Sequence, residues 1–180
     1  MKTGSVRAGM LLAASSLLAF GAAQASDSAR HEAQAMEKAK VSLTEAIHMA
    51  ERQGNGQAIS AEYEFKNGDP AYYEIKVLRD DGQKLTEYQL DPNTGKVKEV
   101  KDEKFEKLFT RIKPTAIQNA PTSLGRAITT AETRSGGKAK EAQVNRDGDQ
   151  LQYEVKVVKL DGASETLKIN GSDGKVASAK

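Results

Sequence analysis

The chain has 180 residues, with no cysteine and no tryptophan, and its 27 Lys and Arg side chains nearly balance its 25 Asp and Glu side chains. The absence of cysteine excludes disulfides and thiolate chemistry. The near-neutral charge argues against a nucleic-acid-binding role, because phosphate contacts require an excess of Lys and Arg.

Residues 1–25 have the features of a secretory signal peptide. Lys2 and Arg7 give a basic start, residues 8–20 form an apolar run, and the segment ends in Ala-Gln-Ala. An apolar run of 13 residues is too short to cross a bilayer, which takes about 20. We expect export to the periplasm with cleavage after Ala25. A retained N-terminal anchor is the alternative.

The two halves of the remaining chain differ in charge. Residues 26–100 carry 10 basic and 14 acidic side chains, whereas residues 101–180 carry 15 and 11. Opposite net charges favour head-to-tail self-association, although ordinary scatter on solvated surfaces gives the same numbers.

Two amphipathic helices are expected after a polar N-terminal segment. Residues 26–40 predict only a weak helix, since Met36 is their one large apolar residue. Residues 42–53 predict a firm helix that begins with a capping box at Ser42 and Glu45. A second helix repeats this apolar stripe, but Arg126 takes the place of Glu45. The stripes are Leu43, Ala46, Ile47 and Ala50, and Leu124, Ala127, Ile128 and Ala131.

Each helix is followed by alternating strands joined by Gly-containing turns. Residues 72–82 read YYEIKVLRDDG and residues 152–162 read QYEVKVVKLDG, so one unit occurs twice. The expected fold class is α+β, with two similar modules of a helix packed on a three- to four-stranded antiparallel meander. The modules cover residues 41–100 and 121–180, and each is expected to close its own small core.

Residues 101–120 are expected to form a helical linker between the modules. Phe105, Leu108, Phe109 and Ile112 make an apolar stripe, and the helix should end before Pro114. Residues 113–121 are then expected to be a linker.

The repeated unit resembles the PepSY domain, here in tandem. The resemblance rests on the capped helix, the strand YYEIKV, the DG turn and the closing stretch LDPNTGKV at residues 90–97. The second copy departs from it with NGSD at residues 170–173. The resemblance implies an exported or membrane-anchored protein that inhibits or chaperones a peptidase, and it supplies no catalytic motif.

No arrangement of residues predicts catalysis. The two histidines, His31 and His48, are expected to lie far apart, and a metal site needs several convergent ligands. We therefore expect no enzymatic activity, no metal and no cofactor.

The remaining candidate for function is a protein-binding surface. Tyr72, Glu74, Lys76 and Leu78 should share the outer face of a strand, and Phe105 and Phe109 offer apolar contacts from the linker. Edge strands also offer peptide capture by strand addition. The first expectation is a periplasmic binding module that restrains a peptidase. The alternative is a small-molecule or metal-binding accessory of an envelope transport or redox system.

Overall fold

The computed structural model describes residues 26–66, 68–79, 82, 84–103 and 112–179. The predicted signal peptide lies outside these ranges, as does the linker helix predicted around Phe105 and Phe109. The helices are α1 (Asp27–Lys38), α2 (Leu43–Gly54), α3 (Pro114–Gln118) and α4 (Leu124–Ser135). The strands are β1 (Gly56–Glu64), β2 (Tyr72–Arg79), β3 (Leu85–Leu90), β4 (Val97–Glu103), β5 (Lys138–Asp147), β6 (Gln150–Val158), β7 (Ser164–Asn170) and β8 (Val176–Ala179).

A helix followed by a four-stranded antiparallel meander occurs twice, which confirms the predicted α+β class. The first unit is α2 with β1–β4, and the second is α4 with β5–β8. Both helices begin as predicted. Ser42 and Glu45 form the full capping box on α2, whereas Ser123 alone caps α4 by accepting a hydrogen bond from the Arg126 N–H.

The two meanders are joined into one sheet, which the sequence did not predict. The strand order is β4-β3-β2-β1-β5-β6-β7-β8, and β1 pairs antiparallel with β5. Ala61 faces Ala142, the residue at the same position in the second unit, so the halves are related by a local two-fold axis at this pair. This is the isologous pairing of a symmetric dimer, placed within one chain.

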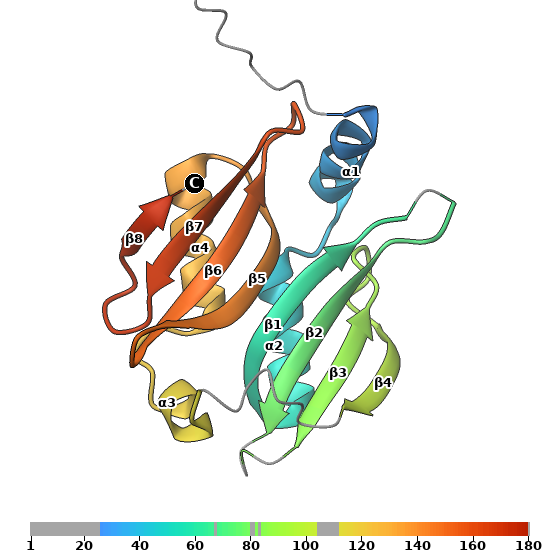
Figure 1. Ribbon diagram of the computed structural model, residues 1–180. Helices are drawn as coiled ribbons and strands as arrows, with labels where there is room; N and C mark the ends of the chain where they lie inside the picture. The colour runs from blue at the N-terminus through green and yellow to red at the C-terminus, as the bar shows by residue number, and fades with distance from the viewer. Residues whose placement is uncertain (1–25, 67, 80–81, 83, 104–111, 180) are drawn as a thin grey trace, which may run out of the picture.

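One core serves both units, so the expectation of two separate cores was wrong. The buried apolar side chains of α2, α4 and the inner face of the sheet form a single cluster. Figure 1 shows α2 and α4 side by side on one face of the sheet, and the two helices contact each other. A β-carbon at Gly125 on α4 would lie 3.4 Å from the Thr44 methyl group, which is ordinary van der Waals contact between the two helices.

The short helix that precedes each unit packs on the other unit. α1 contacts β5, and α3 contacts β1. Met36 and Ile117 each lie seven residues before the next helix, at Leu43 and Leu124, and they are 5% and 4% exposed. Residues 26–40 are therefore a docked helix and not a weak one. Each half covers part of its neighbour, which interlocks the two.

The helix α3 lies within residues 113–121, which were predicted only as a linker. The helix predicted before them was expected to end before Pro114, because the residue before a proline avoids the helical region. In the structure, α3 begins at Pro114, with Lys113 extended as the N-cap. Proline is well suited to the first turn of a helix, since the N–H that it lacks would have no partner there.

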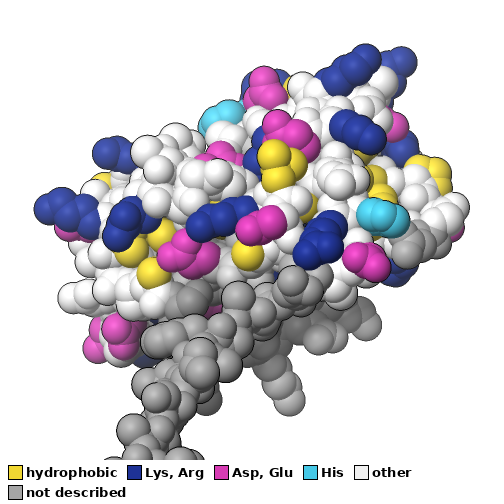
Figure 2. Space-filling model, turned by 90° about the horizontal axis from the view of Figure 1, so that it is seen from above, with side chains coloured by type: hydrophobic (Ala, Val, Ile, Leu, Met, Phe, Trp, Pro, Cys, Tyr) yellow, Lys and Arg dark blue, Asp and Glu magenta, His cyan; other side chains and the backbone are white. Residues whose placement is uncertain are grey.

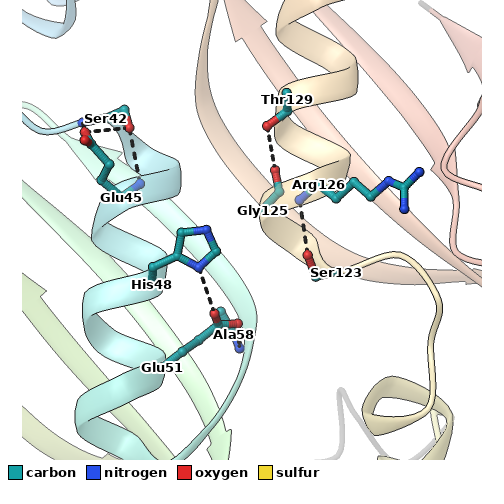
Figure 3. A network of polar contacts seen from close by, with 9 residues as sticks. All are labelled: Ser42, Glu45, His48, Glu51, Ala58, Ser123, Gly125, Arg126 and Thr129. Atoms are coloured by element: carbon teal, nitrogen blue, oxygen red, sulfur yellow. Dashed lines mark hydrogen bonds and ion pairs between the residues drawn. The ribbon is translucent and has the colours of Figure 1, made fainter.

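A glutamate near the end of each main helix fixes the first strand that follows. Glu51 Oε1 accepts a hydrogen bond from the Ala58 N–H at 3.0 Å (Figure 3). Glu132 Oε1 accepts one from the Ala139 N–H at 2.9 Å. Both N–H groups lie next to a β-bulge, where one strand contains an extra residue. The carboxylates thus bind N–H groups beside the irregular positions of the sheet.

Candidate protein-binding surface

Three of the predicted surface residues share the outer face of β2. Tyr72, Glu74 and Lys76 alternate with the buried Tyr73, Ile75 and Val77, as the two-residue period of a strand requires. Each of the three is partly exposed. The helices α2 and α4 lie on the opposite face, while α1 and α3 lie near the two ends of the strands (Figure 1).

The charges on this face are linked across three strands. Lys76 Nζ lies 3.4 Å from Glu74 Oε1 and 3.8 Å from Glu87 Oε2 on β3. Glu87 is in turn 3.9 Å from Lys101 Nζ on β4, and its side chain is only 8% exposed. The Glu87 carboxylate is therefore held between two lysines, an arrangement that offsets the cost of its burial.

Acidic side chains meet where the two halves join. Glu62 on β1 pairs with Glu74 on one side and with Glu141 on β5 on the other. Burial raises the pKa of Glu62, and the neighbouring Glu141 and Glu64 carboxylates raise it further. The pKa of Glu74 is also raised, first by burial and then by Glu87. A cationic group placed here would relieve this repulsion.

Leu78 was predicted on this surface, and the structure shows that it is buried. It is 1% exposed, and its equivalent on β6, Val158, is 7% exposed. Leu78 pairs with Gln57, whose side-chain amide donates to the Gln118 carbonyl at the end of α3 (3.3 Å). Met36 of α1 lines the same cavity as Val158. The short helices thus cover the ends of the outer face, which strand alternation alone does not predict.

The other predicted surface residues differ in what the structure shows of them. Phe105 and Phe109 lie outside the described residues. Tyr72 lies at the pairing with Glu64, and burial together with the Glu64 and Glu74 carboxylates raises its pKa. Its hydroxyl is protonated at neutral pH, as that of an ordinary tyrosine is, and it is able to donate a hydrogen bond.

The tyrosine on the inner face of β2 and the equivalent tyrosine of β6 have a structural role. The Tyr73 hydroxyl donates to the Val41 carbonyl at 2.6 Å, and the Tyr153 hydroxyl donates to the Thr122 carbonyl. Burial raises the pKa of Tyr153 to about 12. Each tyrosine fastens its strand to the segment just before the main helix, which explains the tyrosine shared by the two sequence repeats.

No group of three His, Asp or Glu side chains in the described part of the chain is arranged to hold a metal ion. The two histidines lie well apart on the surface (Figure 2). His48 points into the space beside α4, and its Nδ1 lies 3.4 Å from Glu51 Oε2 (Figure 3). Figure 2 also shows Lys and Arg interspersed with Asp and Glu, with only small separate apolar areas on that face.

Among the described residues, no helix is both long enough and apolar enough to cross a membrane.

No curated protein matches the chain at a significant level. Two solved structures are similar. A "putative lipoprotein" from Clostridium difficile 630 is 21% identical, with 79% of this chain and 94% of that chain covered and a TM-score of 0.49. The YpmB protein from Bacillus subtilis is 15% identical, with 74% and 92% covered and a TM-score of 0.32.

The family model described as "Peptidase propeptide and YPEB domain" (PepSY) matches residues 40–101. This range contains α2, β1, β2, β3 and most of β4. The second unit has the same order of helix and strands and continues the same sheet. Residues 40–101 therefore form a PepSY domain, and residues 114–179 contain a second module of the same architecture.

Proposed function

We propose that this chain is an exported, non-enzymatic protein-binding module, and that its partner is an exported peptidase whose activity it restrains. The observation that carries this proposal is the outer face of the sheet. It presents partly buried charges and Tyr72 across adjacent strands, while the main helices pack on the other face. The description of the family as a peptidase propeptide domain supports the choice of partner.

The outer face has the size of one side of a stable interface. Eight strands spaced about 4.8 Å apart span about 34 Å, and strands of eight residues are about 26 Å long. Their product is about 880 Å² before the ends covered by α1 and α3 are subtracted, and a standard interface buries about 800 Å² on each partner. A partner that covers the middle of the sheet would contact both halves.

The chemistry of this face favours a partner with basic side chains opposite the junction of β1 and β5. Burial raises the pKa of Glu62 and of Glu74, and repulsion by neighbouring carboxylates raises each further, chiefly from Glu141 for Glu62 and from Glu87 for Glu74. Lys or Arg from a partner would replace this repulsion with attraction in a partly desolvated site. Tyr72 adds an aromatic contact at the side of the cluster, and tyrosine is enriched among residues that dominate binding energy.

The proposal is tested by adding the purified chain, residues 26–180, to a periplasmic peptidase fraction. We expect slower cleavage, and we expect Tyr72→Ala to raise the concentration needed for half inhibition by roughly tenfold or more, since truncating a dominant contact costs about 2 kcal/mol. Gln53→Ala, an exposed change on the opposite layer, is the matched control.

Two results would count against the proposal. Unchanged proteolysis at every concentration would exclude restraint of a peptidase in that fraction. Equal inhibition by wild type, Tyr72→Ala and a Glu62→Lys/Glu74→Lys variant would show that the outer face of the sheet is not the surface used.

A further inference from the structure

The second half contains a cationic groove between α4 and the turn that leads into β8. The groove has a volume of about 640 Å³, within the range of ligand sites. Arg126 and Arg134 on α4 and Lys175 after the turn supply its charge, and all three are exposed. Thr130 and Val176 line its less polar part.

In the first half, a side chain fills the space that is equivalent to the groove of the second half. Met49 of α2 occupies the helix position equivalent to Thr130, and it lies against Gly95 in the turn before β4. A β-carbon added at Gly95 would be 2.6 Å from the Met49 sulfur. At the equivalent Gly174, the nearest atom of α4 is Arg126 Nε, at 3.7 Å. Replacement of a long apolar side chain by threonine therefore leaves the space that forms the groove.

The charge of the groove also differs from the charge at the equivalent place in the first half. Glu45 on α2 turns back to accept a hydrogen bond from the Ser42 N–H at 2.8 Å. Arg126 takes this position on α4 and points away from α2, toward the groove side of the helix (Figure 3). Within the described residues, Arg126 and Arg134 make no ion pair, while Lys175 pairs with Asp173 at 3.6 Å.

The threonine hydroxyls in the groove are engaged by the helix itself. Thr129, Thr130 and Thr133 each donate a hydrogen bond to the carbonyl four residues earlier, at 3.1, 3.1 and 2.8 Å. Their protons are therefore directed at α4, so the contacts to a negative ligand come from the arginines. A guanidinium group binds a carboxylate through two parallel N–H groups.

We propose that this groove binds an acidic, extended segment of a partner protein, with one carboxylate at Arg126 and another at Arg134. The arginines are eight residues apart on α4, or about 12 Å along the helix axis. In an extended peptide, two acidic side chains four residues apart lie on the same side and about 13 Å from each other.

This inference rests on the proposed function in one respect only, namely that the ligand belongs to a protein. It concerns a surface on the helical layer, opposite the outer face of the sheet. The outer face would contact a basic part of a partner, and the groove would contact an acidic part. Binding at the groove can be measured without any peptidase, so failure of one proposal is distinguishable from failure of the other.

The test uses the chain of residues 26–180 and a short labelled peptide with two glutamates four residues apart, in an otherwise neutral sequence. A peptide with glutamine at both positions is the control. We expect the acidic peptide to bind and to shift amide NMR signals of α4 and of residues 170–176. The Arg126→Glu/Arg134→Glu variant should bind roughly tenfold or more weakly, and binding should weaken as salt is added.

Two further variants separate the groove from general charge. Thr130→Met recreates the side chain of the first half, so it should reduce binding while leaving net charge and fold unchanged. Arg52→Glu, on the exposed last turn of α2, should leave binding unchanged. The proposal is overturned if the glutamine peptide binds equally, if the shifts lie outside α4 and the turn, or if inorganic phosphate or free glutamate reproduces them at the same concentration.

Discussion

Ile117 provides a direct test of the interlocked arrangement of the two halves. It lies in α3, between the two halves, and is 4% exposed. A linker residue without tertiary contacts would tolerate truncation, with a change in stability of about 0.5 kcal/mol or less. The structure predicts a much larger effect, because Ile117 belongs to the shared core and α3 packs on β1.

For Ile117→Ala, the expected loss is about 2–5 kcal/mol, the range found when a buried isoleucine is cut back to alanine. In a chain of this length, 1 kcal/mol corresponds to about 2–4 °C in the melting temperature. The melting temperature should therefore fall by about 4–20 °C. The change is measured by circular dichroism on heating and by urea unfolding, in which the midpoint should fall while the slope stays constant.

Leu160→Ala is the control, because Leu160 is 62% exposed and its truncation should change stability by less than about 0.5 kcal/mol. Hydrogen exchange adds a local measurement, since the amides near Leu78 should lose protection when Ile117 is truncated. An unchanged midpoint for Ile117→Ala, equal to that of the control, would refute the interlocking of the halves through α3.

Three other substitutions test the structural assignments. Tyr73→Phe leaves the buried Val41 carbonyl without its donor and should cost about 1–3 kcal/mol in urea unfolding. Glu62→Gln should stabilise the protein at neutral pH by a few tenths to about 1 kcal/mol, because it removes a partly buried charge that Glu141 also repels. The folded-state pKa of Glu62 is raised, so its ionisation opposes folding as pH rises through that pKa, and the advantage of glutamine should vanish below about pH 4. The pKa of Asp91 is shifted in the opposite direction. Hydrogen bonds from the Lys98 side chain and from the Asn93 N–H lower the pKa of this carboxyl to about 2. Its contribution is present above about pH 4 and is lost as pH falls toward 2, so Asp91→Asn should flatten the acid unfolding profile while keeping the turn.

Local patterns predicted the main helix of each half and the antiparallel meander that follows it. The apolar stripe and Ser42 placed α2, and the same stripe with Ser123 placed α4, because helix periodicity and capping depend on nearby residues. The junction of the halves depends on the pairing of Ala61 with Ala142, which no local pattern encodes. A strand of alternating character can remain an edge or gain a neighbour, and the sequence does not distinguish the two.

The candidate surface was predicted only in part, for the same reason. Strand alternation placed Tyr72, Glu74 and Lys76 on one face. Leu78 follows the same alternation but lies under an end of the sheet that α3 covers, a long-range contact. The cationic groove did leave a sequence signal, namely Arg126 in place of Glu45. Its meaning required the structure, which shows that Thr130 also opens the space beside it.

Differences between the halves separate the requirements of the fold from those of binding. Both units adopt the same helix-and-meander arrangement, so a position occupied by different residues in the two units does not by itself determine that arrangement. Met49 packs on Gly95 in one unit, and Thr130 leaves the equivalent space open in the other, while the backbone turn is retained. Tyr73 and Tyr153, by contrast, are identical and make the same hydrogen bond. Substitutions that copy one half into the other are therefore expected to preserve folding, and a change in binding that they cause can be assigned to the surface itself.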